Sequence, residues 1–123
     1  MLVIDDELNL GRCIKRMLKH HDVSVLTDGD AGFDRLREGA LPDLVLCDLL
    51  MPGRTGIELY EELEQCRPEV LARLVFMTGA SNTPAFERFL AKHHRVRVLS
   101  KPFGPGSIDA LVEESLAPVS CVP

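Results

Sequence analysis

The chain has 123 residues, of which 46% are hydrophobic and 27% charged, the ordinary balance of one soluble globular domain. Its formal net charge of −5 argues against nucleic acid as a direct partner, and no apolar stretch approaches the roughly 20 residues of a membrane-spanning helix. The four cysteines show no C-x-x-C spacing, which favours free thiols in a cytosolic protein over a metal site.

Short apolar runs alternate along the chain with longer amphipathic segments, and the short runs have the character of buried strands. In chain order, the predicted strands are residues 2–4, 23–26, 44–47, 74–77 and 96–99. The predicted helices are 10–18, 30–38, 57–63, 84–92 and 107–116. Five strands that alternate with five helices predict an α/β domain with a doubly wound parallel sheet, covered by helices on both faces.

Residues of known preference mark some of the element ends. Asp30 is the predicted N-cap of the second helix and Gly39 its end, and Pro84 suits the first turn of the fourth helix. The chain shows no repeat and no internal linker. We therefore expect one domain over residues 1–117, followed by a frayed tail at 118–123.

Charged and polar residues stand at the carboxyl ends of the predicted strands, where sheets of this kind bind ligands. They are Asp5, Asp6 and Glu7 after the first strand, Asp48 after the third, Thr78 after the fourth and Lys101 after the fifth. The second strand supplies only Thr27-Asp28-Gly29, as expected for an edge strand. The sequence thus predicts that several carboxylates, a hydroxyl and an ammonium group share one cleft.

Carboxylates gathered in this way repel one another, so the pKa of at least one of them should be raised when no cation is bound. Magnesium removes this repulsion and commonly combines a few carboxylates with waters and a phosphate oxygen. We therefore predict an open Mg²⁺ site whose missing ligand is a phosphoryl group, with Thr78 and Lys101 as donors to its oxygens. Asp48, on the middle strand, is the candidate nucleophile that forms an aspartyl phosphate.

At these residues the sequence resembles the receiver domains of two-component response regulators. The matching stretches are VIDDE (3–7), DLLMPGRTG (48–56), MTG (77–79) and SKPF (100–103), each at a predicted strand end and in the family's order. The resemblance implies a flavodoxin-like sheet with strand order 2-1-3-4-5. It also implies a cytoplasmic phosphorelay protein, phosphorylated by a histidine kinase or a histidine phosphotransfer protein.

The family roles carry over residue by residue. Asp5 and Asp6 match the metal-binding acidic pair, Asp48 the phospho-acceptor and metal ligand, Thr78 the switch hydroxyl, Lys101 the lysine that pairs with the acidic site, and Leu50 the residue whose backbone carbonyl binds the metal. The Lys101–Pro102 bond is cis in the family. A receiver domain catalyses only its own phosphorylation and dephosphorylation, so no separate substrate is expected. The downstream target stays unknown, and a homodimer is compatible with the sequence.

Three departures from the family pattern affect these expectations. Val98 stands where receivers commonly carry Tyr or Phe. In the family this aromatic side chain couples phosphorylation to the outer surface of the domain, so the presence of that coupling here stays open. Leu50 and Ala80 stand where polar residues help to place the hydrolytic water in some receivers, which predicts a long-lived phospho-aspartate. The stretch before the fifth strand lacks the usual Gly-Ala and is more similar to the C-terminal receivers of hybrid histidine kinases. Met1 lies directly on the first strand, which is typical of an excised domain.

Simpler interpretations exist for single residues. Asp48 alone would serve as a turn cap. Arg54 and Glu58 are interpreted as solvated, Phe86 and Phe89 as packing residues, and the paired histidines, among them His93-His94, as surface residues at helix ends.

Three other functions are alternatives to the phospho-accepting switch. A degenerate receiver that acts only as an interaction module stays possible on the output side, because of Val98. A Mg²⁺-dependent phosphatase with an Asp nucleophile needs a second acid two residues further on, where the chain has Leu50. A flavodoxin-like cofactor binder needs a phosphate-binding loop after the first strand, where Asp5, Asp6 and Glu7 would repel phosphate.

Overall fold

In the part of the chain that the structure describes, a five-stranded parallel sheet in the order β2-β1-β3-β4-β5 forms the centre of the molecule. The computed structural model describes residues 1–51, 54–79, 83–101 and 104–116. The strands are β1 (Leu2–Ile4), β2 (Ser24–Leu26), β3 (Val45–Asp48), β4 (Leu74–Thr78) and β5 (Arg97–Ser100). The predicted fold class and strand order are confirmed. The expectations for the tail 118–123, for Ala80 and for the Lys101–Pro102 bond lie outside the described residues.

The helices are α1 (Leu8–Met17), α2 (Gly29–Glu38), α3 (Gly56–Cys66), η1 (Pro68–Arg73), α4 (Pro84–Lys92) and α5 (Pro105–Leu116). The five predicted helices are present, and the described chain adds the short 3₁₀ helix η1 between α3 and β4. Its six residues are too few to show a helical period in the sequence. Pro68 suits its first turn, and the fully buried Val70 holds it against the core.

One predicted helix cap is wrong. The N-cap of α2 is Asp28, whose Oδ1 atom accepts a hydrogen bond of 2.7 Å from the backbone N–H of Ala31. Asp30 lies inside the first turn instead. Both residue types suit an N-cap, but only the extended backbone of Asp28 (φ −144°, ψ 157°) allows its side chain to reach back to the helix. Gly39 is the C-cap and Pro84 lies in the first turn of α4, as predicted.

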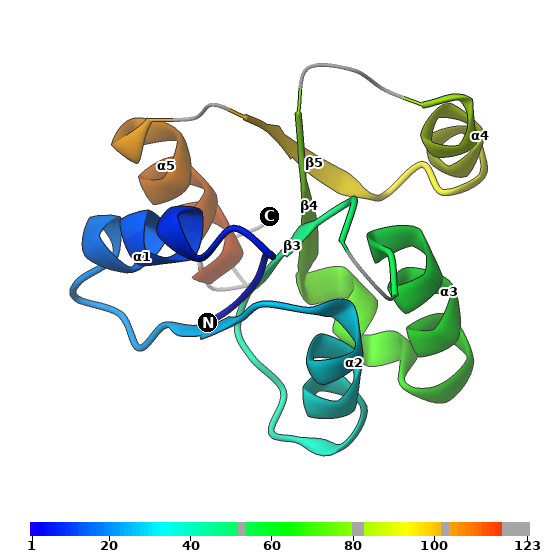
Figure 1. The fold of residues 1–123 in the computed structure, drawn as a ribbon, viewed down its shortest axis with the longest axis horizontal. Helices are drawn as coiled ribbons and strands as arrows, with labels where there is room; N and C mark the ends of the chain where they lie inside the picture. The colour runs from blue at the N-terminus through cyan, green and yellow to red at the C-terminus, as the bar shows by residue number, and fades with distance from the viewer. Residues whose placement is uncertain (52–53, 80–82, 102–103, 117–123) are drawn as a thin grey trace, which may run out of the picture.

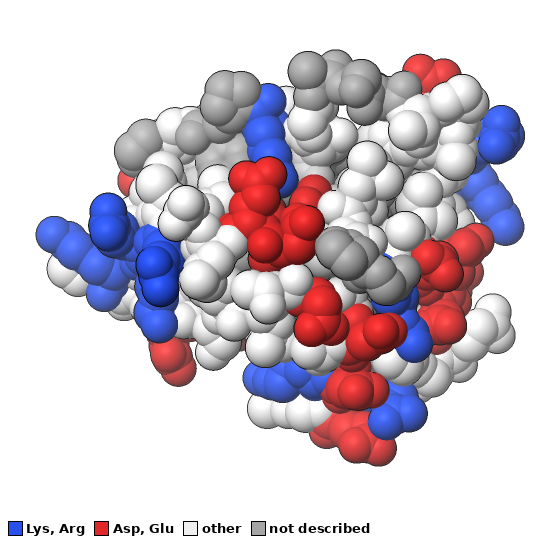
Figure 2. All heavy atoms as spheres, viewed as in Figure 1, with Lys and Arg blue, Asp and Glu red and all other residues white. Residues whose placement is uncertain are grey.

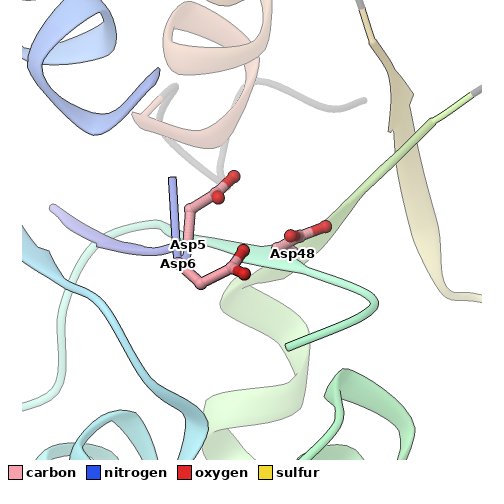
Figure 3. A group of neighbouring side chains, drawn as sticks. All are labelled: Asp5, Asp6 and Asp48. Carbon is pink, nitrogen blue, oxygen red and sulfur yellow. The ribbon is translucent and has the colours of Figure 1, made fainter. Parts of the chain in front are cut away.

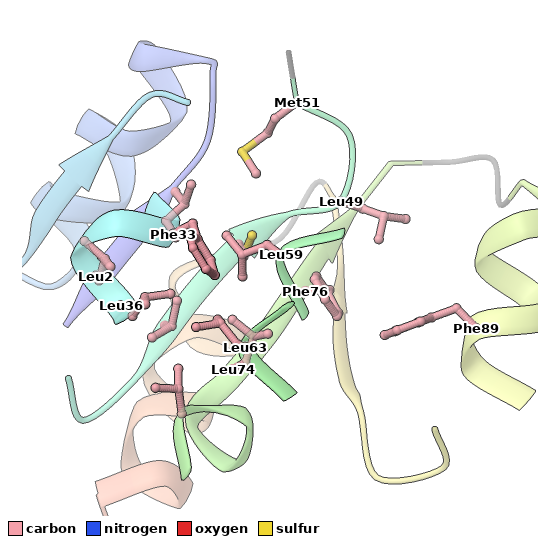
Figure 4. Close-up of a cluster of buried hydrophobic side chains, with 14 of the residues drawn as sticks. Leu2, Phe33, Leu36, Leu49, Met51, Leu59, Leu63, Leu74, Phe76 and Phe89 are labelled. Carbon is pink, nitrogen blue, oxygen red and sulfur yellow. The ribbon is translucent and has the colours of Figure 1, made fainter. Parts of the chain in front are cut away.

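Helices cover both faces of the sheet, and each face has its own hydrophobic core. In Figure 1, α1 and α5 lie on one side of the strands, and α2, α3 and α4 lie on the other. Side chains of successive strand residues alternate between the two cores, as the strand period of two requires. The larger core, drawn in Figure 4, includes Leu2, Phe33, Leu36, Leu59, Leu63, Phe76 and Phe89. The smaller core includes Val3, Ile14, Leu46, Met77, Ile108 and Val112.

The aromatic residues of α4 are internal. Phe86 and Phe89 are buried, which confirms their interpretation as packing residues. His93, the C-cap of α4, is not the surface residue that was predicted, because its side chain is only 11% exposed. Its ring centroid lies 4.7 Å from that of Phe89 and 4.8 Å from that of Tyr60 on α3. These three rings join α4 to α3.

None of the helices in the described ranges is long and apolar enough to cross a membrane.

Candidate functional site

Backbone hydrogen bonds of the sheet place each candidate residue at the same edge. Asp48 is the last residue of β3 and Thr78 the last of β4. The N–H of Asp5, just after β1, donates to the carbonyl of Leu26 on β2 at 3.0 Å. The N–H of Lys101, just after β5, donates to the carbonyl of Thr78 at 2.7 Å. Four side chains from different strands are therefore aligned by the ladder itself.

Three carboxylates meet at this edge. Each of Asp5, Asp6 and Asp48 offers a carboxylate oxygen, and these three atoms all lie within 4.8 Å of one another. Figure 3 shows Asp5 and Asp6, from the end of β1, and Asp48, from β3, directed toward a common space. Asp5 is completely buried, Asp48 is 8% exposed and Asp6 is exposed. The predicted acidic cluster is present, with its members at different depths.

Lys101 reaches into this cluster. Its Nζ atom lies 3.1 Å from Oδ2 of Asp5 and 3.4 Å from Oδ1 of Asp48. The other oxygen of Asp5, Oδ1, accepts a hydrogen bond of 2.8 Å from the backbone N–H of Glu7. Both oxygens of the most buried carboxylate thus have a donor, which a charge without access to water requires. Asp6 and one edge of Asp48 are left facing the solvent side.

The protonation of the site reflects this arrangement. Burial and, to a smaller extent, the charge of Asp5 raise the pKa of Asp48 to about 6, although Lys101 offsets part of the rise. For Lys101, partial burial alone would lower the pKa, but the hydrogen bond to Asp5 and the charge of Asp48 outweigh it, so the pKa is raised. The expected rise in a carboxyl pKa is confirmed, although burial contributes more than repulsion. Burial also raises the pKa of the Cys47 thiol, in keeping with its interpretation as a core residue.

The site opens to solvent through a pocket of about 320 Å³. Its lining consists of Asp6, Glu7, Asp48, Leu49, Leu50, Thr78, Gly79, Thr83 and Lys101. The hydroxyl of Thr78 lies 3.4 Å from the carbonyl oxygen of Gly79, a weak local hydrogen bond that leaves it available to another acceptor. The predicted residues Asp6, Asp48, Leu50, Thr78 and Lys101 therefore border one pocket, with Asp5 buried beneath them.

The residues present fit a hard divalent cation. Carboxylate oxygens are the ligands that Mg²⁺ prefers, and three of them surround one space that holds a single ammonium group. Lys101 supplies one positive charge beside three carboxylate groups, so negative charge is left uncompensated. Leu50 lines the pocket and is 59% exposed, which is compatible with the expected use of its backbone carbonyl. On the surface, acidic side chains gather near the centre of the view in Figure 2, with a basic side chain beside them.

In the segment that leads into α3, the interpretation of Arg54 as solvated is wrong, whereas Glu58 is exposed as predicted but has an additional role. Arg54 is not solvated, since its side chain is only 23% exposed and contacts α2 and α3. Glu58 forms a capping box with Thr55: the Thr55 hydroxyl accepts from the N–H of Glu58, and the Glu58 carboxylate accepts from the N–H of Thr55. The T-x-x-E spacing is the known sequence signature of this cap and would have predicted it. Nothing local in the sequence signals the contacts of Arg54.

Comparisons with known proteins identify the family and the fold. Residues 1–113 match the model of the response regulator receiver domain family. The chain is 32% identical over 85 residues to the transcriptional regulatory protein DltR of Streptococcus agalactiae, a match that covers 68% of this chain and 37% of the relative. It is 31% identical over 118 residues to the DNA-binding response regulator MtrA of Mycolicibacterium smegmatis, with 94% and 50% covered. The chain thus spans at most half the length of these two relatives.

Among solved structures, the response regulator receiver domain protein from Clostridium thermocellum matches with a TM-score of 0.76. The sequence identity is 23%, and the match covers 93% of this chain and 90% of the other. At this identity the likeness concerns the fold. Membership of the family follows from the match to the family model over residues 1–113, and the solved structure shows that the fold is shared.

Proposed function

The chain belongs to the response regulator receiver domain family of two-component signalling, and from this premise we propose that Asp48 is the residue that accepts the phosphoryl group. The proposal is supported by the position of Asp48 at the end of the central strand, on the border of the open pocket. A carboxylate with a raised pKa is a better nucleophile than a free one, and it is still ionised at neutral pH.

The donor proposed for this transfer is a phosphohistidine of a histidine kinase or a histidine phosphotransfer protein. The bond between phosphorus and the histidine nitrogen breaks, and a bond between phosphorus and an Oδ atom of Asp48 forms. Lys101, whose Nζ atom lies 3.4 Å from Asp48, would contact the transferred group and balance its charge. The hydroxyl of Thr78, which also lines the pocket, would donate to a phosphoryl oxygen.

Mg²⁺ is the proposed cofactor, held by Asp6, Asp48 and the backbone carbonyl of Leu50. When bound, the ion would neutralise the carboxylates and coordinate a phosphoryl oxygen, which lowers the barrier to attack by one anion on another. Asp5 is proposed to act mainly through Lys101, because its Oδ atoms already accept from Lys101 and from the backbone N–H of Glu7. Its charge still contributes to the attraction of the cation.

The domain is proposed to catalyse only its own phosphorylation and dephosphorylation, and to bind a downstream protein in a phosphorylation-dependent manner. A cytoplasmic location is part of the proposal. It is supported by the free thiols of Cys13, Cys47 and Cys66, since reduced cysteines are typical of that compartment.

The observation that carries the proposal is the meeting of Asp5, Asp6, Asp48 and Lys101, from the ends of three strands, at one open pocket. The test is incubation of the protein with acetyl phosphate, with and without Mg²⁺, followed by intact mass measurement. Wild type should gain one phosphoryl group only with Mg²⁺, and Asp48→Asn should gain none.

The matched control is Asp43→Asn, which removes an exposed carboxylate near the opposite end of β3 and should be modified like wild type. A wild-type protein that stays unmodified, while its fold is intact, would contradict the proposal. That outcome would favour the second candidate, a degenerate receiver that binds its partner without phosphorylation. The observation on its side is Val98, which leaves the middle of β5 exposed without an aromatic side chain.

A further inference from the structure

Arg54 links the loop that follows β3 to two helices. Its Nε atom lies 3.2 Å from Oδ1 of Asp30 on α2, and its Nη1 atom contacts Oε2 of Glu62 on α3. Its guanidinium carbon lies 4.0 Å from the centroid of the Phe33 ring, which belongs to α2. One side chain therefore combines two ion pairs with a cation–π contact, and most of it is shielded from water.

The backbone of Arg54 is held as closely as its side chain. A Cβ atom added to Gly29, the first residue of α2, would collide with the carbonyl oxygen of Arg54. The loop thus packs directly on the start of α2 at a position where the helix has no side chain. The backbone and the side chain of Arg54 therefore both hold the C-terminal end of the loop against α2.

The same loop end is tied to the candidate site. The N–H of Gly56, two residues after Arg54, donates to the carbonyl of Leu49 at 2.9 Å. A Cβ atom on Gly56 would lie 2.9 Å from the carbonyl oxygen of Asp48 and 3.1 Å from Cα of Leu49. The segment from Arg54 to Gly56 therefore packs directly on the backbone of Asp48 and Leu49. A displacement of the Arg54 end would shift that backbone.

We propose that Arg54 is a positioning residue, which anchors the loop after β3 to α2 and α3 and so holds Asp48 and the backbone of Leu50 in the geometry that binds Mg²⁺. This inference rests on the proposed function, because it gives Arg54 a role in the affinity of that same site. Arg54 does not touch the pocket itself, whose lining does not include it. Its effect passes through the backbone contacts at Gly56.

Arg37 offers a matched comparison. Its guanidinium carbon also lies over the Phe33 ring, at 5.6 Å from the centroid, and it pairs with Asp34 and Glu38 at 3.8 Å each. All of these partners belong to α2, as Arg37 itself does. Replacement of Arg37 removes the same charge and a contact to the same ring, but it leaves the loop end untouched.

The experiment compares wild type, Arg54→Ala, Arg54→Lys and Arg37→Ala in the full chain. Mg²⁺ affinity is measured by titration of the metal alone, followed through amide chemical shifts. Amide hydrogen exchange at Leu49 and Gly56 is measured without metal, as a readout that does not depend on activity. Arg54→Ala should weaken Mg²⁺ binding by roughly three- to tenfold and speed exchange of the Gly56 N–H by a similar factor, the effect expected from loss of a cation–π contact and two partly shielded ion pairs.

Arg54→Lys should fall between wild type and Arg54→Ala, because an ammonium group keeps the charge but loses the planar stacking and the fork of donors. Arg37→Ala should stay within about twofold of wild type in both measurements, as is usual for exposed ion pairs. Equal effects of Arg54→Ala and Arg37→Ala, or no effect of Arg54→Ala, would overturn the inference. If Arg54→Ala does not fold, unchanged values in Arg54→Lys would overturn it.

The two proposals fail in different ways. If wild type takes no phosphoryl group, the proposed function fails whatever the Arg54 variants do. If wild type is modified on Asp48 while all four proteins bind Mg²⁺ equally, only the role of Arg54 fails.

Discussion

Oδ1 of Asp48 lies 3.4 Å from Nζ of Lys101, yet the pKa of Asp48 is raised to about 6 rather than lowered. An isolated ion pair would favour the charged form of the acid. Here burial and the neighbouring charge of Asp5 outweigh the lysine, which Asp5 also shares. At neutral pH the folded protein therefore carries an ionised carboxylate at a cost in free energy, and a bound cation or phosphoryl group would relieve that cost.

Asp48→Asn should stabilise the metal-free protein at pH 8. The folded pKa of about 6 lies above the ordinary value of 3.8, so ionisation of Asp48 favours the unfolded state, and its cost is fully present above pH 6 and absent below pH 4. We expect a gain of about 2 kcal/mol in the free energy of unfolding at pH 8 and almost none at pH 4. Urea denaturation of both proteins at the two pH values measures this difference.

Asp43→Asn is the control for that measurement, because the Asp43 side chain is 69% exposed and pairs only loosely with Arg73, at 3.6 Å. Its effect should be small at both pH values. A destabilised Asp48→Asn protein at pH 8 would show that Lys101 compensates Asp48 fully, against the electrostatics described above.

Mg²⁺ should raise the thermal midpoint of wild type at pH 8. A ligand that binds only the folded state at ten times its dissociation constant contributes about 1.4 kcal/mol. At pH 5 the gain should shrink, because the proton that Asp48 then carries competes with the metal. Calorimetric melts with MgCl₂, compared with KCl at equal ionic strength, provide the measurement, and Asp6→Asn should lose most of the gain at pH 8. Equal stabilisation by KCl would contradict a specific site.

Lys101→Met should destabilise the protein by about 3 kcal/mol, since it leaves the fully buried carboxylate of Asp5 without its cation. The double variant Asp5→Asn/Lys101→Met should recover much of this loss, because the fully buried charge of Asp5 is then removed together with its cation. The control for the loss of a lysine charge is Lys19→Met, because Lys19 is exposed and lies just after the end of α1. Guanidinium denaturation gives the free energy of unfolding of wild type and of the three variants. A double variant no more stable than Lys101→Met would count against a stabilising Asp5–Lys101 pair.

Leu50→Asn should shorten the lifetime of the phospho-aspartate. Leu50 lines the pocket beside Asp48 and is 59% exposed, so it places an apolar group where a polar one would orient an attacking water. The decay of the phosphorylated species, followed by intact mass after removal of the phosphodonor, measures the lifetime. Leu8→Asn changes a similarly exposed leucine at the start of α1 and should leave the decay unchanged. A short lifetime in wild type would contradict the expectation.

The sequence predicts the sheet and the cluster well for a simple reason. The carboxyl ends of parallel strands meet at one edge, so Asp5, Asp48, Thr78 and Lys101 are placed together once the strands are recognised. The strand order came from the family resemblance, since strand pairing cannot be read from periodicity alone. Arg54 was misjudged because its partners Asp30 and Phe33 are more than 20 positions away and come near it only through packing of α2.

The different burial of Asp5, Asp6 and Asp48 could not be predicted from the sequence either. Asp5 and Asp6 are neighbours in the chain, but Asp5 is still hydrogen-bonded to β2 and turns inward to Lys101, whereas Asp6, at the following bend, lines the pocket. His93 illustrates the same limit, since its aromatic neighbour Tyr60 lies on another helix. Contacts between elements decide such details, and one sequence does not encode them in any local pattern.

The pair formed by Asp5 and Lys101 joins residues that are 96 positions apart. Contacts of such high separation are completed late in folding, because the entropy of closing the intervening chain must be overcome first. A nascent chain, or a fragment that ends before β5, would hold its acidic residues without the cation that compensates them. Competence to accept phosphate should therefore arise in one cooperative step, when the final strand docks beside β4, and not by degrees as the domain is synthesised.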